Sequence, residues 1–408
     1  MTEAVYAVRL HGAHVGAIQQ RDRYTVFTFD PDYWQRPDRC VLGLWFEDHP
    51  RERPRATNAV PAWFSGLLPE GPLRELIARE QGVSTYREME LLARIGADLP
   101  GAVTVVPDPE AGIDADFTRV REERRGRRPL PAPLLHRASL AGMVMKYSMS
   151  MRGGRMAAPA HDEDGDWILK TPDPTFPALP ENEYTVMSLA RWVGIEVPET
   201  VLWERDSIDD LGDGAWRSAE TTAYAIRRFD RSPAGRIHIE DFAQVRGTSG
   251  TGDAKYRSTV ETVAGIAYRG QDSDSLREMV RRSVFNLLVG NGDAHLKNWS
   301  LIYDDGRRAR LSPAYDLVCT GAYEGHVELA LPFGGATRLA DVTRESFARL
   351  AGLLHVGEAE VLDVVDETVE RFREAWAEGA VGDLAPAPVR AWIDEHLEAT
   401  SLCLARRS

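Results

Sequence analysis

The stretch Gly290-Asn-Gly-Asp-Ala-His-Leu-Lys-Asn-Trp-Ser-Leu-Ile-Tyr303 carries the strongest structural signal in this chain of 408 residues. Apolar residues recur at helical spacing from Leu276 to Leu288 just before it, and Gly290 is placed to end that helix. Two short apolar runs around Asp304-Asp305-Gly306 then predict a β-hairpin. This order of helix, polar loop and hairpin places the polar side chains of the loop at one end of a buried scaffold.

The oxygen-bearing side chains of this loop suit phosphoryl transfer, which needs a carboxylate to orient the attacking hydroxyl and oxygen ligands for Mg²⁺. The interval from Asp293 to Asn298 is the one that protein-kinase catalytic loops keep between these two functions. Asp316, after Leu311-Ser-Pro-Ala-Tyr, stands where a second metal-binding carboxylate belongs. The alternative is that Asn291, Asp293 and Asn298 are ordinary turn residues that hydrogen-bond to nearby backbone.

Residues upstream could complete such a site. Lys170 ends an apolar strand and could reach phosphates, and Glu183, in the first turn of the next helix, could pair with it. A favourable charge at a helix N-terminus is the alternative for Glu183. His295 has no partner histidine or cysteine at ligand spacing, so we assign it to nucleotide contact or loop structure. The loop Ser139–Lys146 holds one glycine, too few for a Walker or kinase glycine motif.

Composition narrows the class of protein. With 43% hydrophobic residues the chain can form two or three domains, each with its own core. A formal charge of −14 repels a phosphate backbone, so we expect no direct, sequence-independent DNA binding. The N-terminus is polar and no apolar run is long enough to span a membrane, so we expect neither secretion nor membrane insertion. The cysteines are odd in number and widely spaced, which predicts a reducing cytoplasm: Cys40, Cys319 and Cys403.

The first two parts of the chain differ sharply in pattern. Residues 1–107 predict a module with an antiparallel meander from Ala4 to Phe29, followed by helices that include Glu88 to Ile95. Residues 108–135 turn acidic, then arginine-rich, then proline-rich. We interpret them as an exposed connector with solvated arginines, because no aromatic residue is interleaved for nucleic-acid binding.

The remaining sequence predicts a sheet lobe, residues 136–230, followed by a helical lobe, residues 231–408. Gly153-Gly154 predicts a hairpin turn within the sheet lobe. Its expected elements are three strands and one helix: Met143 to Met151, Trp167 to Lys170, Thr221 to Phe229, and the helix Glu183 to Val193.

Together these motifs resemble the HipA-like serine/threonine kinases of bacterial toxin–antitoxin pairs, over nearly the whole chain. The N-terminal module is similar to that of full-length members. The motifs that carry the resemblance occur in the order of the family: Leu67-Leu-Pro-Glu-Gly-Pro72, Ile95-Gly-Ala-Asp-Leu-Pro-Gly-Ala-Val103, Ser139-Leu-Ala-Gly-Met-Val-Met-Lys146, Ile168-Leu-Lys170, Asn182-Glu-Tyr184, Arg228-Phe-Asp-Arg231, Glu240-Asp-Phe242, Gly290 to Asn298 and Leu311 to Asp316.

The resemblance implies an α+β fold of the two-lobed protein-kinase type, with an extra N-terminal α/β subdomain and an all-helical C-terminal lobe. It implies ATP and Mg²⁺ as cofactors, Asp293 as the catalytic carboxylate, and Asn298 and Asp316 as metal ligands. Ser139 resembles the self-phosphorylated serine of the family, whose modification silences the kinase. The implied nucleotide contacts are Ala141, Gly142, Met143, Val144, Met145, Lys146, Lys170, Arg227, Arg228, Phe229, His295, Leu296, Lys297, Asn298, Tyr315 and Asp316.

The chain departs from the family pattern at three of these contacts. Val144 replaces the usual glutamine, Met145 replaces its polar neighbour, and Arg227 replaces a frequent hinge glutamate. A phosphate on Ser139 would add about −1.5 to −2 charges beside the loop that holds ATP, so we expect it to displace that loop.

The function implied by the resemblance is that of a toxin kinase which phosphorylates a serine or threonine of a target protein. The target would be an aminoacyl-tRNA synthetase similar to glutamyl-tRNA synthetase, and its phosphorylation would stop translation. A small, basic, HipB-like helix-turn-helix antitoxin would bind the acidic chain and connect it to DNA indirectly. The alternatives are a small-molecule phosphotransferase of the aminoglycoside kinase type, and an inactive kinase fold kept as a regulatory module.

Overall fold

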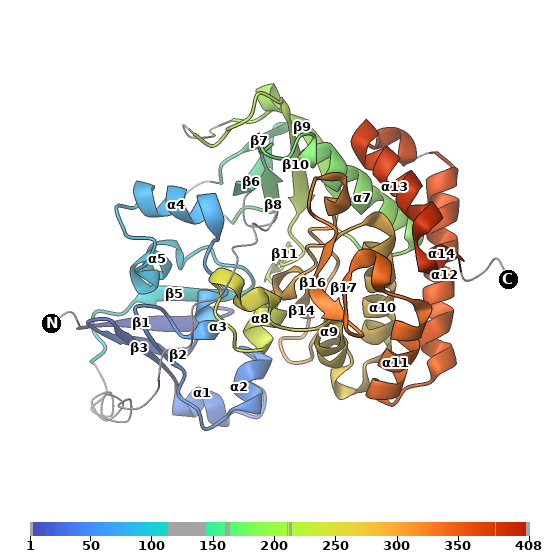
Figure 1. The fold of residues 1–408 in the computed structure, drawn as a ribbon. Coiled ribbons are helices and arrows are strands. Elements are labelled where there is room, and N and C mark those ends of the chain that lie inside the picture. The colour runs from blue at the N-terminus through green and yellow to red at the C-terminus, as the bar shows by residue number, and fades with distance from the viewer. Residues whose placement is uncertain are drawn as a thin grey trace. The chain divides into compact units, whose positions relative to one another are not determined.

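A computed structural model of the chain describes residues 3–112, 144–159, 164–209, 211, 214–379 and 381–404 (Figure 1). Ser139 and the predicted nucleotide contacts Ala141, Gly142 and Met143 lie outside these residues. The chain forms two compact units. The predicted boundaries at residues 107, 135 and 230 remain predictions. Unit 1 comprises Met1–Ala138, Ser232–Lys255 and Tyr303–Ala309, and unit 2 comprises Ser139–Arg231, Tyr256–Ile302 and Arg310–Ser408.

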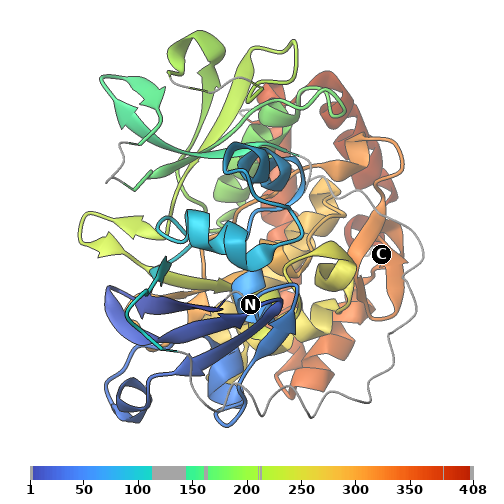
Figure 2. The same ribbon diagram turned by 90° about the vertical axis from the view of Figure 1, so that its left-hand side faces the viewer.

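Unit 1 begins with the predicted antiparallel meander, visible as adjacent dark blue strands in Figure 2. Its two tight turns contain residues with positive φ, Gly12 at 77° and Asp22 at 53°, a backbone region that glycine and aspartate tolerate best. The sheet has the order β4-β3-β2-β1-β5. Its strands are β1 (Glu3–Leu10), β2 (Ala13–Arg21), β3 (Tyr24–Phe29), β4 (Arg55–Thr57) and β5 (Val103–Pro107).

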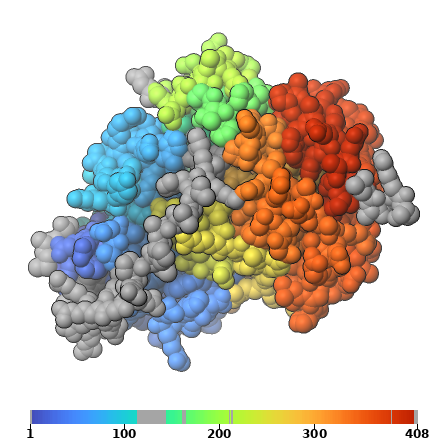
Figure 3. All heavy atoms as spheres, viewed as in Figure 1, coloured from blue at the N-terminus to red at the C-terminus, as the bar shows by residue number. Residues whose placement is uncertain are grey.

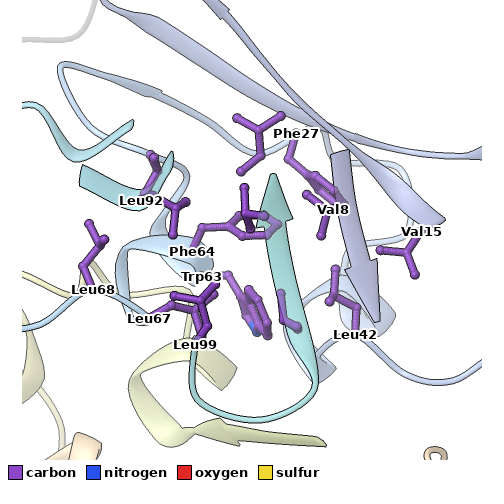
Figure 4. Packing of buried hydrophobic residues seen from close by; sticks show 14 of the residues in the cluster. Val8, Val15, Phe27, Leu42, Trp63, Phe64, Leu67, Leu68, Leu92 and Leu99 are labelled. Atoms are coloured by element: carbon purple, nitrogen blue, oxygen red, sulfur yellow. The ribbon is translucent and has the colours of Figure 1, made fainter. Parts of the chain in front are cut away.

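Aromatic and aliphatic side chains pack between this sheet and the helices of unit 1 (Figure 4). The rings of Phe27 and Phe64 lie 4.9 Å apart and those of Trp63 and Phe64 lie 5.1 Å apart, and all three side chains are fully buried. The unit therefore has a core of its own. Its helices are α1 (Pro31–Gln35), α2 (Leu44–Asp48), α3 (Ala62–Ser65), α4 (Gly71–Glu80), α5 (Glu88–Ile95) and α8 (Phe242–Val245).

The fully buried Glu240, on β13 (His238–Asp241), joins three distant parts of unit 1. Its Oε1 accepts hydrogen bonds from the Leu44 backbone N–H at 2.8 Å and the Tyr303 hydroxyl at 2.5 Å, and its Oε2 accepts from Trp63 Nε1 at 2.9 Å. Burial raises the pKa of Glu240 to about 7, although all three hydrogen bonds oppose this shift. The carboxyl group is therefore poised to titrate near neutral pH.

We expect the stability of unit 1 to depend on the ionisation of Glu240. Its pKa in the folded chain, about 7, lies above its ordinary value of 4.5, so the folded state binds the proton more tightly. The stabilisation is complete below pH 4.5 and is lost as the pH rises towards 7, by about 3 kcal/mol. Urea unfolding across this range should show a steeper loss in wild type than in Glu240→Gln. The exposed Glu52→Gln should keep the wild-type slope, and equal slopes for wild type and Glu240→Gln would contradict the prediction.

Unit 2 contains a five-stranded sheet of order β7-β6-β8-β10-β9. The turn between β6 and β7 contains Gly153 and Gly154 with φ of 57° and 78°, which confirms the predicted hairpin turn. Helix α7 (Leu179–Val193) packs against β9 and β10 and begins earlier than predicted, with Pro180 in its first turn. The strands are β6 (Lys146–Arg152), β7 (Arg155–Ala157), β8 (Trp167–Lys170), β9 (Thr200–Glu204) and β10 (Thr222–Arg227).

The rest of unit 2 is helical apart from two hairpins. Helices α10 and α12 pack along each other, with the rings of Phe285 and Phe372 5.6 Å apart, and the C-terminal residues form one continuous orange-to-red surface in Figure 3. Among the described residues, no helix has both the length and the apolar character to cross a membrane. The helices are α9 (Val260–Ala267), α10 (Ser273–Val289), α11 (Arg344–Leu354), α12 (Glu358–Ala377), α13 (Ala387–Ala399) and α14 (Ser401–Leu404); the hairpins are β14 (Ser300–Tyr303) with β15 (Arg310–Leu311) and β16 (Glu328–Phe333) with β17 (Ala336–Arg338).

Candidate functional site

The polar loop after α10 is held in one conformation by its own side chains. Gly290 ends the helix with φ of 73°, as predicted. Asn291 donates from Nδ2 to Asn286 Oδ1 at 3.0 Å, and its Oδ1 accepts from the Asp293 backbone N–H at 3.1 Å. Gly292 donates its N–H to Thr320 Oγ1 at 2.8 Å, and a Cβ at this position would lie 2.4 Å from the Glu328 carbonyl oxygen. Asn291 is therefore a turn residue whose hydrogen bonds present Asp293.

Asn298 follows in the short 3₁₀ helix Leu296–Asn298. Its Oδ1 is buried and has no hydrogen-bond partner among the described residues. A buried amide oxygen without a donor is costly, and a hard cation would satisfy it. The described residues contain no cluster of three His, Cys, Asp or Glu side chains that could hold a metal. Asn298 shares a cavity with the carboxylates of Asp293 and Asp316. These oxygen-bearing side chains fit Mg²⁺, which commonly uses one or two carboxylates and completes its shell with phosphate and water.

Asp316 is the centre of a network of buried and partly buried charges. Its Oδ2 lies 3.2 Å from Lys146 Nζ, and its Oδ1 accepts a hydrogen bond from Lys170 Nζ. Lys170 Nζ also contacts Glu183 Oε1 at 2.5 Å, which confirms the pairing predicted between these two residues. Asp316 has a φ of 55°, an uncommon conformation for a residue other than glycine that is often found at functional sites.

The charges of this network set one another's protonation. Burial alone would raise the pKa of Asp316, but the ammonium groups of Lys146 and Lys170 outweigh burial and hold that pKa well below its ordinary value. Burial likewise would lower the pKa of Lys170, but Asp316 and Glu183 raise it above its ordinary value. Burial raises the pKa of Glu183, since Lys170 offsets it only in part. At neutral pH, Lys170 is therefore a cation and Asp316 an anion.

One small cavity in unit 2 collects these groups. Its volume is about 30 Å³, room for about one or two water molecules. The predicted catalytic carboxylate, both predicted metal ligands and the strand lysine thus come together from loop, strand and helix positions far apart in sequence. The lining residues are Val144, Lys146, Lys170, Leu179, Glu183, Asp293, Asn298, Asp316 and Val318.

Comparison with known proteins identifies the family of this chain. The family model of the HipA-like C-terminal domain matches residues 138–376, and that of the HipA N-terminal domain matches residues 6–106. The chain belongs to the HipA family. It is 39% identical to the Sinorhizobium fredii protein named "Putative kinase Y4dM" over 409 residues, which cover 98% of this chain and 97% of the relative.

A curated HipA sequence and a solved HipA structure, both from Shewanella oneidensis, extend the comparison. The serine/threonine-protein kinase toxin HipA is 26% identical over 296 residues, which cover 66% of this chain and 65% of the toxin. A solved complex of HipA, HipB and operator DNA contains a chain that matches with a TM-score of 0.71 and 22% sequence identity, covering 98% of this chain and 96% of that one. This likeness confirms the predicted α+β fold of the HipA type.

Within this HipA-family chain, the predicted nucleotide contacts outside the cavity have mixed surroundings. The Arg228 side chain is 8% exposed, and its guanidinium donates two hydrogen bonds of 3.0 and 2.9 Å to Asp230. Arg227 is exposed and lies 3.5 Å from Glu199. The rings of Phe229 and Tyr315 lie 5.7 Å apart. The contribution of these residues to nucleotide binding stays a prediction, and the side chain of Arg228 is already engaged.

Most of the remaining predicted nucleotide contacts lie in the loop after α10. His295 and Leu296 are buried, and the Lys297 carbonyl oxygen accepts a hydrogen bond from the Tyr315 hydroxyl at 2.8 Å. Met145 is also buried. Sequence reasoning missed Tyr256, whose hydroxyl donates to Asp293 Oδ1 at 3.3 Å. No local pattern could reveal this contact, because Tyr256 lies 37 residues before Asp293 in the chain.

Proposed function

We propose that this HipA-family chain is an ATP-dependent serine/threonine kinase. The observation that carries the proposal is the meeting of Asp293, Asn298, Asp316 and Lys170 at one cavity. These are the groups that phosphoryl transfer requires: a carboxylate for the acceptor hydroxyl, oxygen ligands for a divalent cation, and a cation for the phosphates. The kinase names of the relatives agree with this assignment.

Each polar side chain at the cavity has a distinct role in this proposal. Asp293 accepts the hydrogen bond of the acceptor hydroxyl and orients its oxygen towards the γ-phosphate. Asn298 and Asp316 would hold Mg²⁺, which would supply positive charge to offset that of the phosphates. Lys170, held by Glu183, binds the phosphates.

Nucleotide binding requires the Asp316 network to open. Asp316 is paired with both Lys146 and Lys170, and the cavity is far smaller than a triphosphate. Phosphate oxygens would replace Asp316 as partners of the two ammonium groups, which frees the Asp316 carboxylate for Mg²⁺. Backbone groups of Ala141 to Lys146 would cover the phosphates.

The adenine end of the site is assigned by family resemblance. The backbone from Arg227 to Phe229 would contact adenine, since the Arg228 side chain already binds Asp230. Tyr315, His295 and the neighbouring residues Leu296 and Lys297 would line the rest of the nucleotide surface.

The biological role in this proposal is that of a cytoplasmic toxin. A HipB-like helix-turn-helix antitoxin would bind the chain, as HipB accompanies HipA in the Shewanella oneidensis complex with operator DNA. The acidic charge of −14 suits a basic partner and leaves DNA contact to that partner. The target would be an aminoacyl-tRNA synthetase of the glutamyl type, and autophosphorylation at Ser139 would switch the kinase off.

Intact-mass spectrometry after incubation with Mg²⁺-ATP tests the kinase activity. The wild type should gain phosphate. In Asp293→Asn the rate of phosphate incorporation should fall at least about 100-fold, because a neutral amide cannot serve as the base for the acceptor hydroxyl. Peptide mapping should place the phosphate on Ser139, and Ser139→Ala should remove it.

The matched control is Asp363→Asn, which makes the same chemical change on the exposed face of α12 and should leave the rate unchanged. Phosphate uptake that survives in Asp293→Asn would contradict the assignment of the catalytic carboxylate. A wild type that takes up no phosphate, even after phosphatase treatment, would contradict the kinase itself.

A further inference from the structure

Tyr256, at the end of the 3₁₀ helix Gly252–Tyr256, makes two contacts with the catalytic loop. Its hydroxyl donates a hydrogen bond to Asp293 Oδ1 at 3.3 Å. The edge of its ring meets His295, with ring centroids 5.3 Å apart and an interplanar angle of 72°. His295 is buried, so it offers the tyrosine ring a fixed surface. One side chain thus contacts both Asp293 and its neighbour two residues on.

This contact leaves the cavity free. Asp293 lines the cavity, whereas Tyr256 is not among its lining residues. The tyrosine hydroxyl therefore binds one carboxylate oxygen without filling the space next to Asp293. A catalytic carboxylate must keep its position to within a fraction of an ångström to act on an acceptor hydroxyl. A hydrogen bond to one carboxylate oxygen is a direct way to hold the side chain in that position.

We propose that Tyr256 is a positioning residue that orients Asp293 for phosphoryl transfer. The inference rests on the proposed kinase function and adds to it a residue outside the predicted site. Tyr256 acts through Asp293 and touches neither the nucleotide nor the acceptor. Its loss should therefore slow the chemical step and leave nucleotide binding unchanged.

The chain just before Tyr256 is anchored by a second interaction. Lys255 Nζ lies 2.6 Å from Glu70 Oε2, and the Lys255 side chain is 7% exposed. Both residues belong to unit 1, and Tyr256 is the first residue of the next segment of unit 2. Glu70 lies in the motif Leu67–Pro72 of the N-terminal module. The ion pair fixes the residue adjacent to Tyr256 in the chain.

Autophosphorylation kinetics with Mg²⁺-ATP and the chain itself as acceptor test the proposal. For Tyr256→Phe, which removes only the hydroxyl, we expect the rate at saturating ATP to fall about tenfold, the equivalent of one charge-assisted hydrogen bond expressed in the transition state. The ATP concentration that gives half the maximal rate should not change. The unfolding midpoint should stay at the wild-type value.

Two further variants make the result specific. Tyr268→Phe removes a tyrosine hydroxyl from the end of α9 in the same unit and should keep the wild-type rate. Lys255→Met should lower the rate several-fold, Lys255→Arg should restore it, and Lys255→Met should add nothing in a Tyr256→Phe background. This non-additivity is expected if the ion pair acts through Tyr256.

The outcomes separate this inference from the kinase assignment. A wild type without Asp293-dependent activity would overturn the proposed function. An active wild type with an unchanged or faster Tyr256→Phe would overturn the role of Tyr256 alone, since a faster variant would mean that the hydroxyl competes with the acceptor. If Tyr256→Phe lost both stability and ATP affinity, the role of Tyr256 would be structural, and this result would also overturn the proposal.

Discussion

Replacing Asp316 with asparagine should abolish phosphate incorporation and lower the free energy of unfolding by about 3 kcal/mol. The Asp316 carboxylate is shared by the ammonium groups of Lys146 and Lys170, and an amide offers no charge to either. Lys170 keeps Glu183, but Lys146 loses its carboxylate partner. The amide is also a poorer ligand for Mg²⁺ than a carboxylate. Intact-mass spectrometry with Mg²⁺-ATP and urea unfolding at pH 7 measure the two losses.

The pH dependence of Asp316→Asn provides an internal check. The pKa of Asp316 lies well below its ordinary value, so its contribution to stability is complete at neutral pH and is lost as the pH falls towards the folded-state value. The stability difference between wild type and variant should therefore persist at pH 5 and shrink only in stronger acid. Asp363→Asn, on the exposed face of α12, should match wild type throughout. Wild-type activity in Asp316→Asn would remove Asp316 from the proposed metal site.

Sequence patterns predicted the elements whose causes are local. The helix α10 and its end at Gly290 follow from apolar spacing and from the freedom of glycine to adopt positive φ. The hairpin at Gly153 and Gly154 has the same origin. The pairing of Lys170 with Glu183 was predictable because a strand end and the first turn of the following helix are close in sequence.

Features that depend on contacts between distant residues escaped prediction. Segments Ser232–Lys255 and Tyr303–Ala309 group with the N-terminal unit, although nothing in their own periodicity indicates it. The second hairpin, Glu328–Phe333 with Ala336–Arg338, lies in the lobe that was expected to be all-helical. Its strand β16 contacts the loop after α10 through the hydrogen bond of the Ala330 N–H to the Gly292 carbonyl at 2.7 Å. Tertiary contacts of this kind override local propensity.

The candidate site also combines residues that the sequence predicted with contacts that it could not predict. The motif residues Asp293, Asn298 and Asp316 were identified in the sequence and meet at one cavity. The sequence could not show that Asp316 contacts two lysines, because the charge of a carboxylate does not reveal which of several possible partners it has. Lys170 also contacts Glu183, so its ammonium group is shared by two carboxylates.

Replacing Lys170 with methionine should cost about 3–5 kcal/mol of stability and abolish phosphate incorporation. The substitution leaves Glu183 buried without its ammonium partner and near a second carboxylate, Asp316. Burial already raises the pKa of Glu183, so the carboxyl group should take up a proton in the variant. The loss of stability between pH 5 and pH 8, measured by urea unfolding, should therefore be larger in Lys170→Met than in wild type.

A double variant separates the effect on folding from the effect on catalysis. In the double variant, Lys170→Met with Glu183→Met, both members of the buried ion pair are removed together. Asp316 still has Lys146 as a partner, so no charge is left unpaired. Replacing both members of a buried ion pair with apolar side chains is often neutral or stabilising, so most of the lost stability should return. Phosphate incorporation should remain absent, because no ammonium group on β8 binds the phosphates. Recovery of activity together with stability would show that Lys170 serves the fold and not the transfer.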